Sequence, residues 1–358
     1  MINVSFWKDK KVLVTGHTGF KGAWLSIWLH ELGAKVCGYA LEPHTKPSLF
    51  ELANVDSFMK SVIGDIRDLE HLKRTMTEIQ PDIIIHMAAQ PLVRDSYENP
   101  VETYAINVMG TVNVLESARH CSSVRAIVNV TTDKVYENKE WVWGYRETDR
   151  LGGYDPYSNS KACSEMVTSS YINSFFEPRK YEKHGVAIAT ARAGNVIGGG
   201  DWAKDRIIPD IMKSIEKNEK MFIRSPYSIR PWQHVLEPLS GYLMLAEKLF
   251  LEGVRWTGAW NFGPSSDATQ NVESLVKAME KYYEQDLLIE LDLNNKLHET
   301  TILKLDCAKA IEVLGWKNTF NFEQTVALTA EWYKNYYNKD NYKMCVEQIQ
   351  QIQQKLVR

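Results

Sequence analysis

The sequence predicts an α/β protein with a doubly wound parallel sheet and a smaller, mixed α/β C-terminal domain that binds substrate. Short β-branched runs alternate with amphipathic stretches through the first half of the chain, which is typical of a parallel sheet with helices on both faces. A glycine-rich run at residues 16–22 separates the first apolar run from the first amphipathic stretch. The 358 residues also exceed the roughly 250–300 that a single core accommodates, which predicts a second domain.

The expected elements follow in order along the chain. Strands are predicted at residues 11–15, 35–39, 82–86, 126–130 and 186–191, and helices at 21–32, 101–120 and 207–217. The glutamine-rich stretch 346–356 is predicted to be a polar surface helix or a frayed tail. After the last predicted strand the alternation of strand-like and helix-like segments weakens, which indicates a domain boundary. The dinucleotide-binding domain is expected at 1–191 plus about 231–262, and the substrate-binding domain at 192–230 and 263–358.

Composition indicates a soluble enzyme and argues against several other classes. The formal net charge of −3 and the pI near 6.3 oppose nucleic-acid binding, which needs a basic surface. The N-terminus lacks the layout of a signal peptide, and no apolar run approaches the ~20 residues that span a bilayer. Five cysteines without CxxC spacing indicate neither a metal site nor a disulfide framework. We therefore expect a cytoplasmic protein without a metal, a membrane contact or a nucleic-acid partner.

The glycine-rich run predicts where a dinucleotide binds. Its spacing, Gly16-x-x-Gly19-x-x-Gly22, differs from the GxGxxG fingerprint by one residue in the first interval. The first glycine permits the tight turn, the second lets backbone amides approach phosphate, and the third lets the helix lie close to the sheet. The residues expected to hold the cofactor pyrophosphate are Gly16, His17, Thr18, Gly19, Phe20, Lys21 and Gly22. Lys21 would add charge there, whereas His17 would either donate a hydrogen bond or crowd the phosphates. The loop indicates a Rossmann-type sheet.

Two acidic residues are candidates for the adenosine end of the cofactor. An acid usually follows the second strand, about 20 residues on, and binds the ribose. Here Glu42 is the only acid in that region and lies beyond the strand end, so the choice between NAD and NADP stays open. Asp65, after a third strand, is better placed to accept a hydrogen bond from the adenine amino group.

A tyrosine and a lysine four residues apart predict the reaction chemistry. Tyr157 and Lys161 would lie on one face of a helix. There the ammonium is expected to stabilise a phenolate well below the usual tyrosine pKa of about 10. Downstream of a dinucleotide-binding loop, this pair indicates hydride transfer.

As a set, these motifs resemble the extended short-chain dehydrogenase/reductase family over nearly the whole chain. The matching segments are Thr15-Gly-His-Thr-Gly-Phe-Lys-Gly22, Gly64-Asp65, His86-Met-Ala-Ala-Gln90, Asn107-Val-Met-Gly-Thr111, Tyr157-Ser-Asn-Ser-Lys161 and Arg192-Ala-Gly-Asn195. The resemblance implies NAD as the cofactor. It adds the following to the residues expected to bind it: Ile66, Ala88, Ala89, Gln90, Asn107, Tyr157, Lys161 and Arg192.

One further motif resembles a single branch of that family, the nucleotide-sugar 4,6-dehydratases. The segment is Thr131-Thr-Asp-Lys-Val-Tyr136, and the lysine in place of the more usual glutamate is most similar to members that act on CDP-glucose. The resemblance implies conversion of CDP-glucose to its 4-keto-6-deoxy derivative. It also implies a homodimer or homotetramer, and a role in deoxysugar supply for surface polysaccharides such as the lipopolysaccharide O-antigen.

The resemblance implies a role for each catalytic candidate. Tyr157 would take the proton of the 4-hydroxyl, assisted by Thr132, while Lys161 holds the nicotinamide ribose. Asp133 and Lys134 diverge at a strand end and can address different substrate atoms. We assign Asp133 as the acid that protonates the departing 6-hydroxyl and Lys134 as the base at carbon 5. Keeping an ordinary lysine neutral at pH 7 costs about 4–5 kcal/mol, so this base needs a special environment.

Candidate substrate contacts come mainly from the second domain. Guanidinium groups match diphosphate geometry, and amide and indole groups suit hydroxyl contacts and stacking. The residues concerned are Arg94, Thr132, Asn195, Trp202, Arg206, Arg230 and Asn261. Pro231 stands where relatives carry an acidic residue after the arginine, and is a departure from their motif.

Three other interpretations remain open on the sequence. The chain would otherwise be a dehydratase for a different nucleotide sugar, a 4-epimerase or reductase that uses Tyr157 and Lys161 alone, or a non-catalytic dinucleotide-binding protein. Asp133 and Lys134 oppose the epimerase, because no hydroxyl leaves in an epimerisation. The complete catalytic set opposes the non-catalytic reading.

Overall fold

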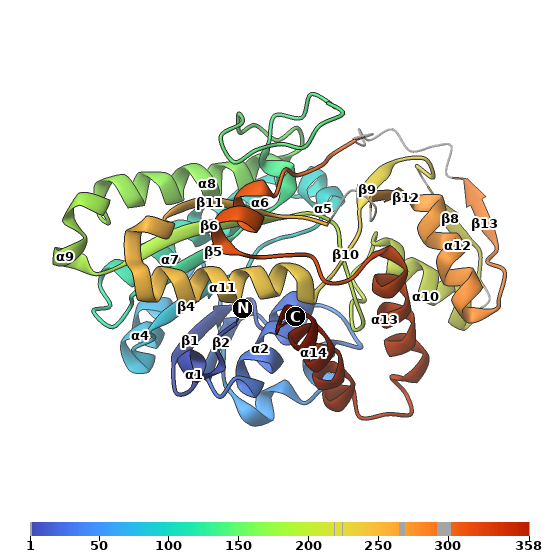
Figure 1. Ribbon diagram of the computed structural model, residues 1–358, viewed down its shortest axis with the longest axis horizontal. Coiled ribbons are helices and arrows are strands. Elements are labelled where there is room, and N and C mark those ends of the chain that lie inside the picture. The colour runs from blue at the N-terminus through green and yellow to red at the C-terminus, as the bar shows by residue number, and fades with distance from the viewer. Residues whose placement is uncertain (1, 218, 224, 265–268, 292–301, 358) are drawn as a thin grey trace.

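A seven-stranded, fully parallel sheet forms the centre of the molecule (Figure 1). The computed structural model describes all residues except 1, 218, 224, 265–268, 292–301 and 358. The strand order is β11-β6-β5-β4-β1-β2-β3. The strands are β1 Lys11–Thr15, β2 Lys35–Ala40, β3 Lys60–Ile63, β4 Ile83–His86, β5 Ala126–Val130, β6 Ala187–Ala193 and β11 Gly258–Phe262. This confirms the predicted doubly wound α/β class, with its order reversing between β1 and β4.

Helices cover both faces of the sheet. On one face lie α2 (Phe20–Glu31) and α11 (Leu236–Glu252); on the other lie α4 (Leu69–Ile79), α7 (Gly110–Arg119) and α8 (Pro156–Ser174). Successive residues of a strand point to opposite faces. Accordingly, Val12 and Val14 join the core beneath α2 and α11, while Leu13 joins the core beneath α4 and α7. Every residue of β4, β5 and β6 is buried, as a doubly covered parallel sheet requires, whereas the edge strand β3 is partly exposed.

Shorter helices connect these elements. The helix predicted at 101–120 consists of three consecutive parts. It begins as α6 (Pro100–Tyr104), continues as a π-helical segment, Ala105–Met109, and ends as α7. The remaining α-helices of this part are α1 Val4–Trp7, α3 Leu49–Leu52, α5 Val93–Glu98 and α9 Tyr181–His184. The 3₁₀ turns are Val55–Phe58, Asp133–Val135, Pro178–Lys180 and Gly253–Trp256.

A smaller mixed region lies beyond the carboxyl ends of the strands, on the right in Figure 1. Its helices are α10 Ile207–Lys217, α12 Val272–Tyr283 and α13 Phe322–Asn335, and a π-helical turn at Ala310–Leu314 precedes α13. Three strand pairs accompany them: β7 Val196–Ile197 with β10 Gln233–His234, β8 Met221–Ile223 with β13 Ile289–Leu291, and β9 Ile229–Pro231 with β12 Thr269–Asn271. The chain enters and leaves this region more than once, because α11 and β11 return to the central sheet.

The C-terminal helix α14 (Asn341–Val357) is ordered and packed rather than frayed. It lies against α2, and Cys345, Ile349 and Ile352 are fully buried. Their spacing of four and three residues places them on one helix face. Gln350, Gln351 and Gln354 are exposed on the other side of the helix, which explains why composition alone predicts a polar helix.

Glu237 on α11 is a buried acid that ties the helix to a loop before α13. One carboxylate oxygen, Oε1, accepts hydrogen bonds from the Thr319 amide (2.9 Å), the Thr319 hydroxyl (2.6 Å) and the Phe320 amide (2.7 Å). The other oxygen has no hydrogen-bond partner among the described residues. Burial, only partly offset by these bonds and the charge of Lys355, raises the pKa of Glu237 from its ordinary 4.5 to about 7.

This shift predicts how stability depends on pH. Between pH 4.5 and 7 the folded protein holds a proton on Glu237 that the unfolded chain releases, so stability falls as pH rises through this window. The loss amounts to about 3 kcal/mol. In Glu237→Gln this part of the slope should vanish. Denaturant titrations of both proteins at the two ends of the window test it, and an equal pH slope in the variant would contradict it.

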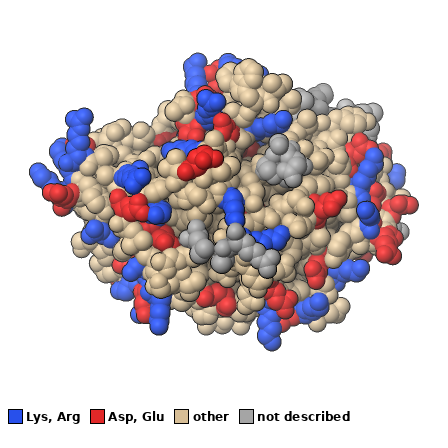
Figure 2. Space-filling view, in the orientation of Figure 1, with Lys and Arg blue, Asp and Glu red and all other residues tan. Residues whose placement is uncertain are grey.

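Charged side chains of both signs intermingle on the face shown in Figure 2. None of the described helices is long and apolar enough to cross a membrane. In the described part of the chain, no three histidine, cysteine or acidic side chains gather as metal ligands would. All five cysteines are free thiols.

Candidate active site

A cleft of about 760 Å³ opens at the carboxyl ends of the central strands, between the sheet and the smaller region. Its walls include the residues that follow β1, β2, β4, β5 and β6, together with the start of α10 and residues from β8 and β9. Ligands of open parallel sheets bind at this edge, where the strand order reverses. The fold therefore brings together segments that lie far apart in the sequence.

The glycine loop forms the floor of the cleft beside β1. Gly16 adopts a left-handed conformation, with φ of 79°, at the turn that leaves the strand. A Cβ on Gly22 would lie 2.1 Å from the carbonyl oxygen of Gly16, so only glycine allows α2 to start this close to the loop. Around them, Thr18, Gly19, Phe20 and Lys21 also line the cleft. The loop thus has the shape that a dinucleotide pyrophosphate needs at a helix N-terminus.

Gly22→Ala is expected to weaken NAD binding by about tenfold or more, because backbone atoms rather than a flexible side chain must move away. A fluorescence titration with NAD measures this, and a melting curve separates it from general unfolding. Gly263→Ala is the matched control, since its Cβ would meet only side-chain atoms, the nearest at 3.3 Å. Equal NAD affinity in Gly22→Ala and the control would contradict the expected fit.

His17 does not present its ring to the cleft. The side chain is fully buried and packs against the Cα of Gly38, where any Cβ would overlap the imidazole at 2.1 Å. Its Nε2 lies 2.7 Å from the hydroxyl of Ser61. Burial lowers the pKa of His17 to about 4, which keeps the ring neutral. Neither of the roles considered for this ring, donating to the phosphates or crowding them, agrees with this placement.

The expected adenosine end contains Gly64, Asp65 and Ile66, all in the cleft wall. The carboxylate of Asp65 accepts three bonds from the Arg67 guanidinium and one from the Arg67 amide. This pairing lowers the pKa of Asp65 and holds the carboxylate as an anion. Glu42 also lines the cleft, beside the end of β2.

Ala88, Ala89 and Gln90 follow β4 and line the middle of the cleft. Asn107 lies behind them, in the π-helical segment, and is almost fully buried. Its amide accepts a hydrogen bond from the Gln90 amide (2.9 Å) and donates to the Gln90 carbonyl (3.1 Å). The side chain of Asn107, predicted to bind cofactor, instead fixes the backbone that faces the cleft.

Tyr157 and Lys161 lie one turn apart on α8 and both face the cleft. The ammonium of Lys161 is buried and donates to the carbonyl oxygen of Val130 (2.8 Å), which ties α8 to the end of β5. Burial lowers the pKa of Lys161 to about 8. These two side chains meet the geometric demand of the predicted catalytic pair.

The expected lowering of the Tyr157 pKa is not seen in this structure. Burial raises it to about 12, and a hydrogen bond with Thr132 and the charge of Arg206 offset the rise only in part. Arg206, rather than Lys161, is the cation that acts on the phenol here. The reason is that the Lys161 ammonium is directed to the Val130 carbonyl.

The segment after β5 carries the predicted acid and base into the cleft. A 3₁₀ turn at Asp133–Val135 begins at Thr132, whose hydroxyl accepts from the Lys134 amide (3.4 Å) and donates to Asp133 Oδ1 (3.0 Å). Asp133 is 2% exposed, and its Oδ2 has no hydrogen-bond partner in the described part of the chain. A Cβ on Gly194 would lie 2.6 Å from that oxygen. Burial raises the pKa of Asp133, opposed by the charge of Lys134.

Lys134 is half-buried and lines the cleft. A second lysine reaches the same region from the glycine loop. The Nζ of Lys21 lies 3.5 Å from the hydroxyl of Tyr242 on α11. Burial and the nearby charges of Arg206 and Lys161 lower the pKa of Lys21 to about 7. The sequence indicated charge near the pyrophosphate, but not this proximity to Asp133 and Lys161.

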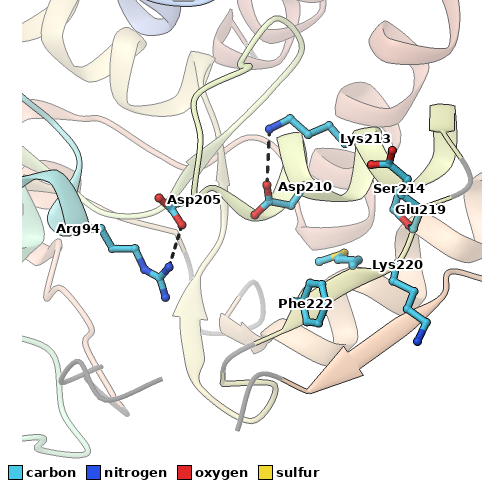
Figure 3. Close-up of a pocket in the computed structure, with 9 residues that line it drawn as sticks. Arg94, Asp205, Asp210, Lys213, Ser214, Glu219, Lys220 and Phe222 are labelled. Atoms are coloured by element: carbon cyan, nitrogen blue, oxygen red, sulfur yellow. Dashed lines mark hydrogen bonds and ion pairs between the residues drawn. The ribbon is translucent and has the colours of Figure 1, made fainter. Parts of the chain in front are cut away.

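Four predicted substrate contacts besides Thr132 also line the cleft: Arg94, Asn195, Arg206 and Arg230. Arg206 pairs with Asp201 at 2.8 Å, and Arg94 pairs with Asp205 at 3.3 Å. Figure 3 shows a side pocket of about 230 Å³ into which the Arg94–Asp205 pair projects. Asp205, Asp210 and Phe222 belong to both cavities, so the side pocket is a lobe of the cleft.

Three other predicted contact residues lie outside the cleft wall. Arg192 and Asn261 are buried beneath it, where Arg192 pairs with Glu165 at 2.9 Å and Asn261 accepts from the Tyr136 hydroxyl at 2.7 Å. Trp202 packs among the aromatic rings of α13. Their polar or aromatic groups already have protein partners. Glu165 was not among the residues predicted from the sequence, although its position four residues after Lys161 places both on the same helix face.

Comparison with known proteins identifies the family of the chain. The family model described as GDP-mannose 4,6 dehydratase matches residues 13–329. A CDP-glucose 4,6-dehydratase of Salmonella typhimurium is 54% identical over 345 residues, 96% of each chain, and a human dTDP-D-glucose 4,6-dehydratase is 26% identical over 94% of each. The crystal structure of a Streptomyces venezuelae dTDP-glucose 4,6-dehydratase with NAD bound has a TM-score of 0.77 at 23% identity, covering 91% of this chain and 97% of that one.

These findings confirm the resemblance seen in the motifs, and the Streptomyces enzyme of the same fold holds NAD in its crystal structure. The chain belongs to the GDP-mannose 4,6 dehydratase family, a group of extended short-chain dehydrogenase/reductases, and is a nucleotide-sugar 4,6-dehydratase.

Proposed function

We propose that this enzyme converts CDP-glucose to CDP-4-keto-6-deoxyglucose. The observation that carries the proposal is the presence of Asp133 and Lys134 in the same cleft as Tyr157 and Lys161. An epimerase has no leaving hydroxyl and needs no such acid and base. The cytidine base is supported by the 54% identity to the Salmonella enzyme.

NAD, held by the glycine loop and Lys161, would supply the redox chemistry as acceptor and later donor of a hydride. Tyr157 removes the 4-hydroxyl proton, with Thr132 as its hydrogen-bond partner, and the resulting ketone acidifies the proton on carbon 5. Lys134 removes that proton and later returns it. Asp133, held in its neutral form by burial, protonates the departing 6-hydroxyl. In each turnover Tyr157 gains a proton and Asp133 loses one, so the sugar loses one water. Release of the Tyr157 proton to solvent and uptake of a proton by Asp133 return both groups to their starting states.

Turnover of CDP-, dTDP-, UDP- and GDP-glucose by the purified protein with NAD tests the proposal directly. We expect a keto-sugar from CDP-glucose with a kcat/KM at least about tenfold above the other three, since base contacts discriminate by 1–3 kcal/mol. Preference for another base would assign a different 4,6-dehydratase. A 4-epimer as the product, without a keto-sugar, would refute the dehydration.

The side chains and loop residues found in the cleft wall are proposed as the ligand contacts. For the cofactor these are Gly16, Thr18, Gly19, Phe20, Lys21, Gly22, Asp65, Ile66, Ala88, Ala89, Gln90, Tyr157 and Lys161; for the sugar nucleotide they are Arg94, Thr132, Asn195, Arg206 and Arg230. The proposed domains follow this division, except that the substrate contacts Arg94 and Thr132 lie in the cofactor-binding part. The parts 1–191 and about 231–262 hold the cofactor, and the parts 192–230 and 263–358 hold the substrate.

We also propose that the chain forms a homodimer, or a homotetramer built from it, through α8 and the helix that ends in α7. Val101, Met109 and Met166 on these neighbouring helices are 83%, 52% and 54% exposed. Met166→Glu should shift the protein toward monomer in sedimentation velocity, while Lys277→Glu on α12 should not. An unchanged sedimentation coefficient in Met166→Glu would contradict this interface.

Free thiols at all five cysteines support a place in a reducing compartment, the cytoplasm. The product class, a 4-keto-6-deoxy sugar, supports a role in supplying deoxysugars for surface polysaccharides such as the O-antigen.

A further inference from the structure

A buried ion pair lies directly beneath the segment that carries the proposed acid and base. Glu165 on α8 and Arg192 on β6 meet through two parallel bonds, Nε–Oε1 at 2.9 Å and Nη2–Oε2 at 3.0 Å. Their side chains are 4% and 3% exposed. This two-pronged geometry fixes distance and orientation together.

The ion pair holds the segment at both ends. Just before Thr132, the hydroxyl of Thr131 donates to Glu165 Oε1 at 2.5 Å. Just after Val135, the hydroxyl of Tyr136 accepts from Arg192 Nη1 at 2.7 Å. Both residues are buried, so neither bond competes with solvent. The four residues between these anchors, Thr132, Asp133, Lys134 and Val135, therefore form a short span with fixed ends.

The same ion pair fixes this span relative to the catalytic helix. Glu165 lies one turn after Lys161 on α8, which also carries Tyr157. Tyr157 and Lys161 keep their mutual geometry because one rigid helix bears both. Asp133 and Lys134 come from a different element, and their placement over the sugar depends on the connection to α8.

We propose that Thr131, Tyr136, Glu165 and Arg192 form a positioning clamp that sets the rate of water elimination more strongly than the rate of oxidation at carbon 4. The inference rests on the proposed roles of Asp133 and Lys134. A displacement of about 1 Å at a proton-transferring group costs about 10²-fold in rate. Loosening the clamp displaces the acid and base, whereas Tyr157 and Lys161 stay in place on α8. Of the groups that serve oxidation, only Thr132 moves with the span, and it assists Tyr157 rather than taking the proton itself.

Tyr136→Phe tests the clamp. The ring remains stacked on Tyr145, with centroids 5.2 Å apart, and only the hydroxyl between Arg192 and Asn261 is removed. We expect elimination to slow by about 10- to 100-fold, with KM and the single-turnover rate of oxidation within about threefold of wild type. Enzyme-bound reduced nicotinamide should then accumulate during turnover. Thr131→Val removes the hydrogen bond at the other end of the segment and serves as the test if Tyr136→Phe does not fold. It should likewise slow elimination more than oxidation and let reduced nicotinamide accumulate.

Thr190→Val is the matched control. Its hydroxyl donates to the same carboxylate, Glu165 Oε2, at 2.6 Å, but it lies on β6 outside the clamped segment. It should lower the melting temperature without accumulation of reduced nicotinamide. Equal slowing of oxidation and elimination in Tyr136→Phe would overturn the clamp. The clamp would also be overturned if Tyr136→Phe and Thr190→Val had the same ratio of elimination rate to oxidation rate. A wild-type protein that converts no nucleotide-linked glucose would instead refute the proposed function.

Discussion

Tyr157→Phe is expected to reduce turnover by about 10²–10⁴-fold, because it removes the base that takes the 4-hydroxyl proton. The first step then fails, so neither reduced nicotinamide nor keto-sugar should appear. The phenylalanine ring occupies the same space beside Thr132, and the backbone of α8 is not expected to change. Binding of NAD and of the nucleotide sugar should therefore change little, and calorimetric titration measures both.

The control for this variant is Tyr337→Phe, a phenol that is 76% exposed and far from the cleft wall. It should retain wild-type turnover. Stopped-flow absorbance of the reduced cofactor resolves the oxidation step in both proteins. Rapid formation of reduced cofactor in Tyr157→Phe would show that another group removes the proton.

Lys134→Met is expected to block product formation while leaving substrate binding nearly intact. The methionine keeps an unbranched side chain of similar length but offers no base for the proton on carbon 5. Oxidation at carbon 4 still proceeds, since Tyr157, Lys161 and Thr132 are untouched. The enzyme should therefore stall with the 4-keto sugar and reduced cofactor bound, and overall turnover should fall by about 10²–10⁴-fold.

Acid quench followed by mass spectrometry of the sugar nucleotide distinguishes the stalled ketone from the dehydrated product. Lys139→Met serves as the control, because that lysine is exposed and paired with Glu137 just beyond the same segment. Exchange of the carbon-5 proton with heavy water gives a second readout, and it should cease in Lys134→Met alone. Unchanged turnover in Lys134→Met would remove the assignment of this base.

The predicted strands and the glycine loop agree closely with the structure because their causes are local. The range 126–130 and the helix at 207–217 were predicted to the residue. Buried parallel strands are runs of apolar, often β-branched residues, and these are visible without knowing the partners. The need for glycine at position 22 is also local, since the obstructing atom belongs to Gly16, six residues earlier.

Arg192, Asn261 and Asn107 show where such prediction fails. Each is a polar residue beside a cleft-forming strand or helix, and each was expected to contact ligand. Arg192 instead bonds to Tyr136, 56 residues away, and Asn261 to the same tyrosine, 125 residues away. A polar side chain near a site can face the ligand or a buried partner. The sequence does not show which, because the partner is brought close only by the sheet.

The ionisation of Tyr157 is a second case. The spacing of Tyr157 and Lys161 predicts that they share a helix face, and they do. It does not predict that the ammonium turns to the Val130 carbonyl, or that Arg206 is the cation acting on the phenol. Those outcomes depend on burial and on charges from three separate elements, which act through space rather than along the chain.

By itself, the sequence determined the class of fold, the place of the cofactor loop and the set of groups able to oxidise and dehydrate a sugar. These follow from backbone requirements, periodicity and residue chemistry within short segments. The tertiary structure alone decided which polar residues face the cleft, how burial shifts the pKa of Asp133, Tyr157 and Lys161, and how one ion pair joins the proposed acid–base segment to α8. The physical reason is that desolvation and long-range pairing exist only once the chain has folded.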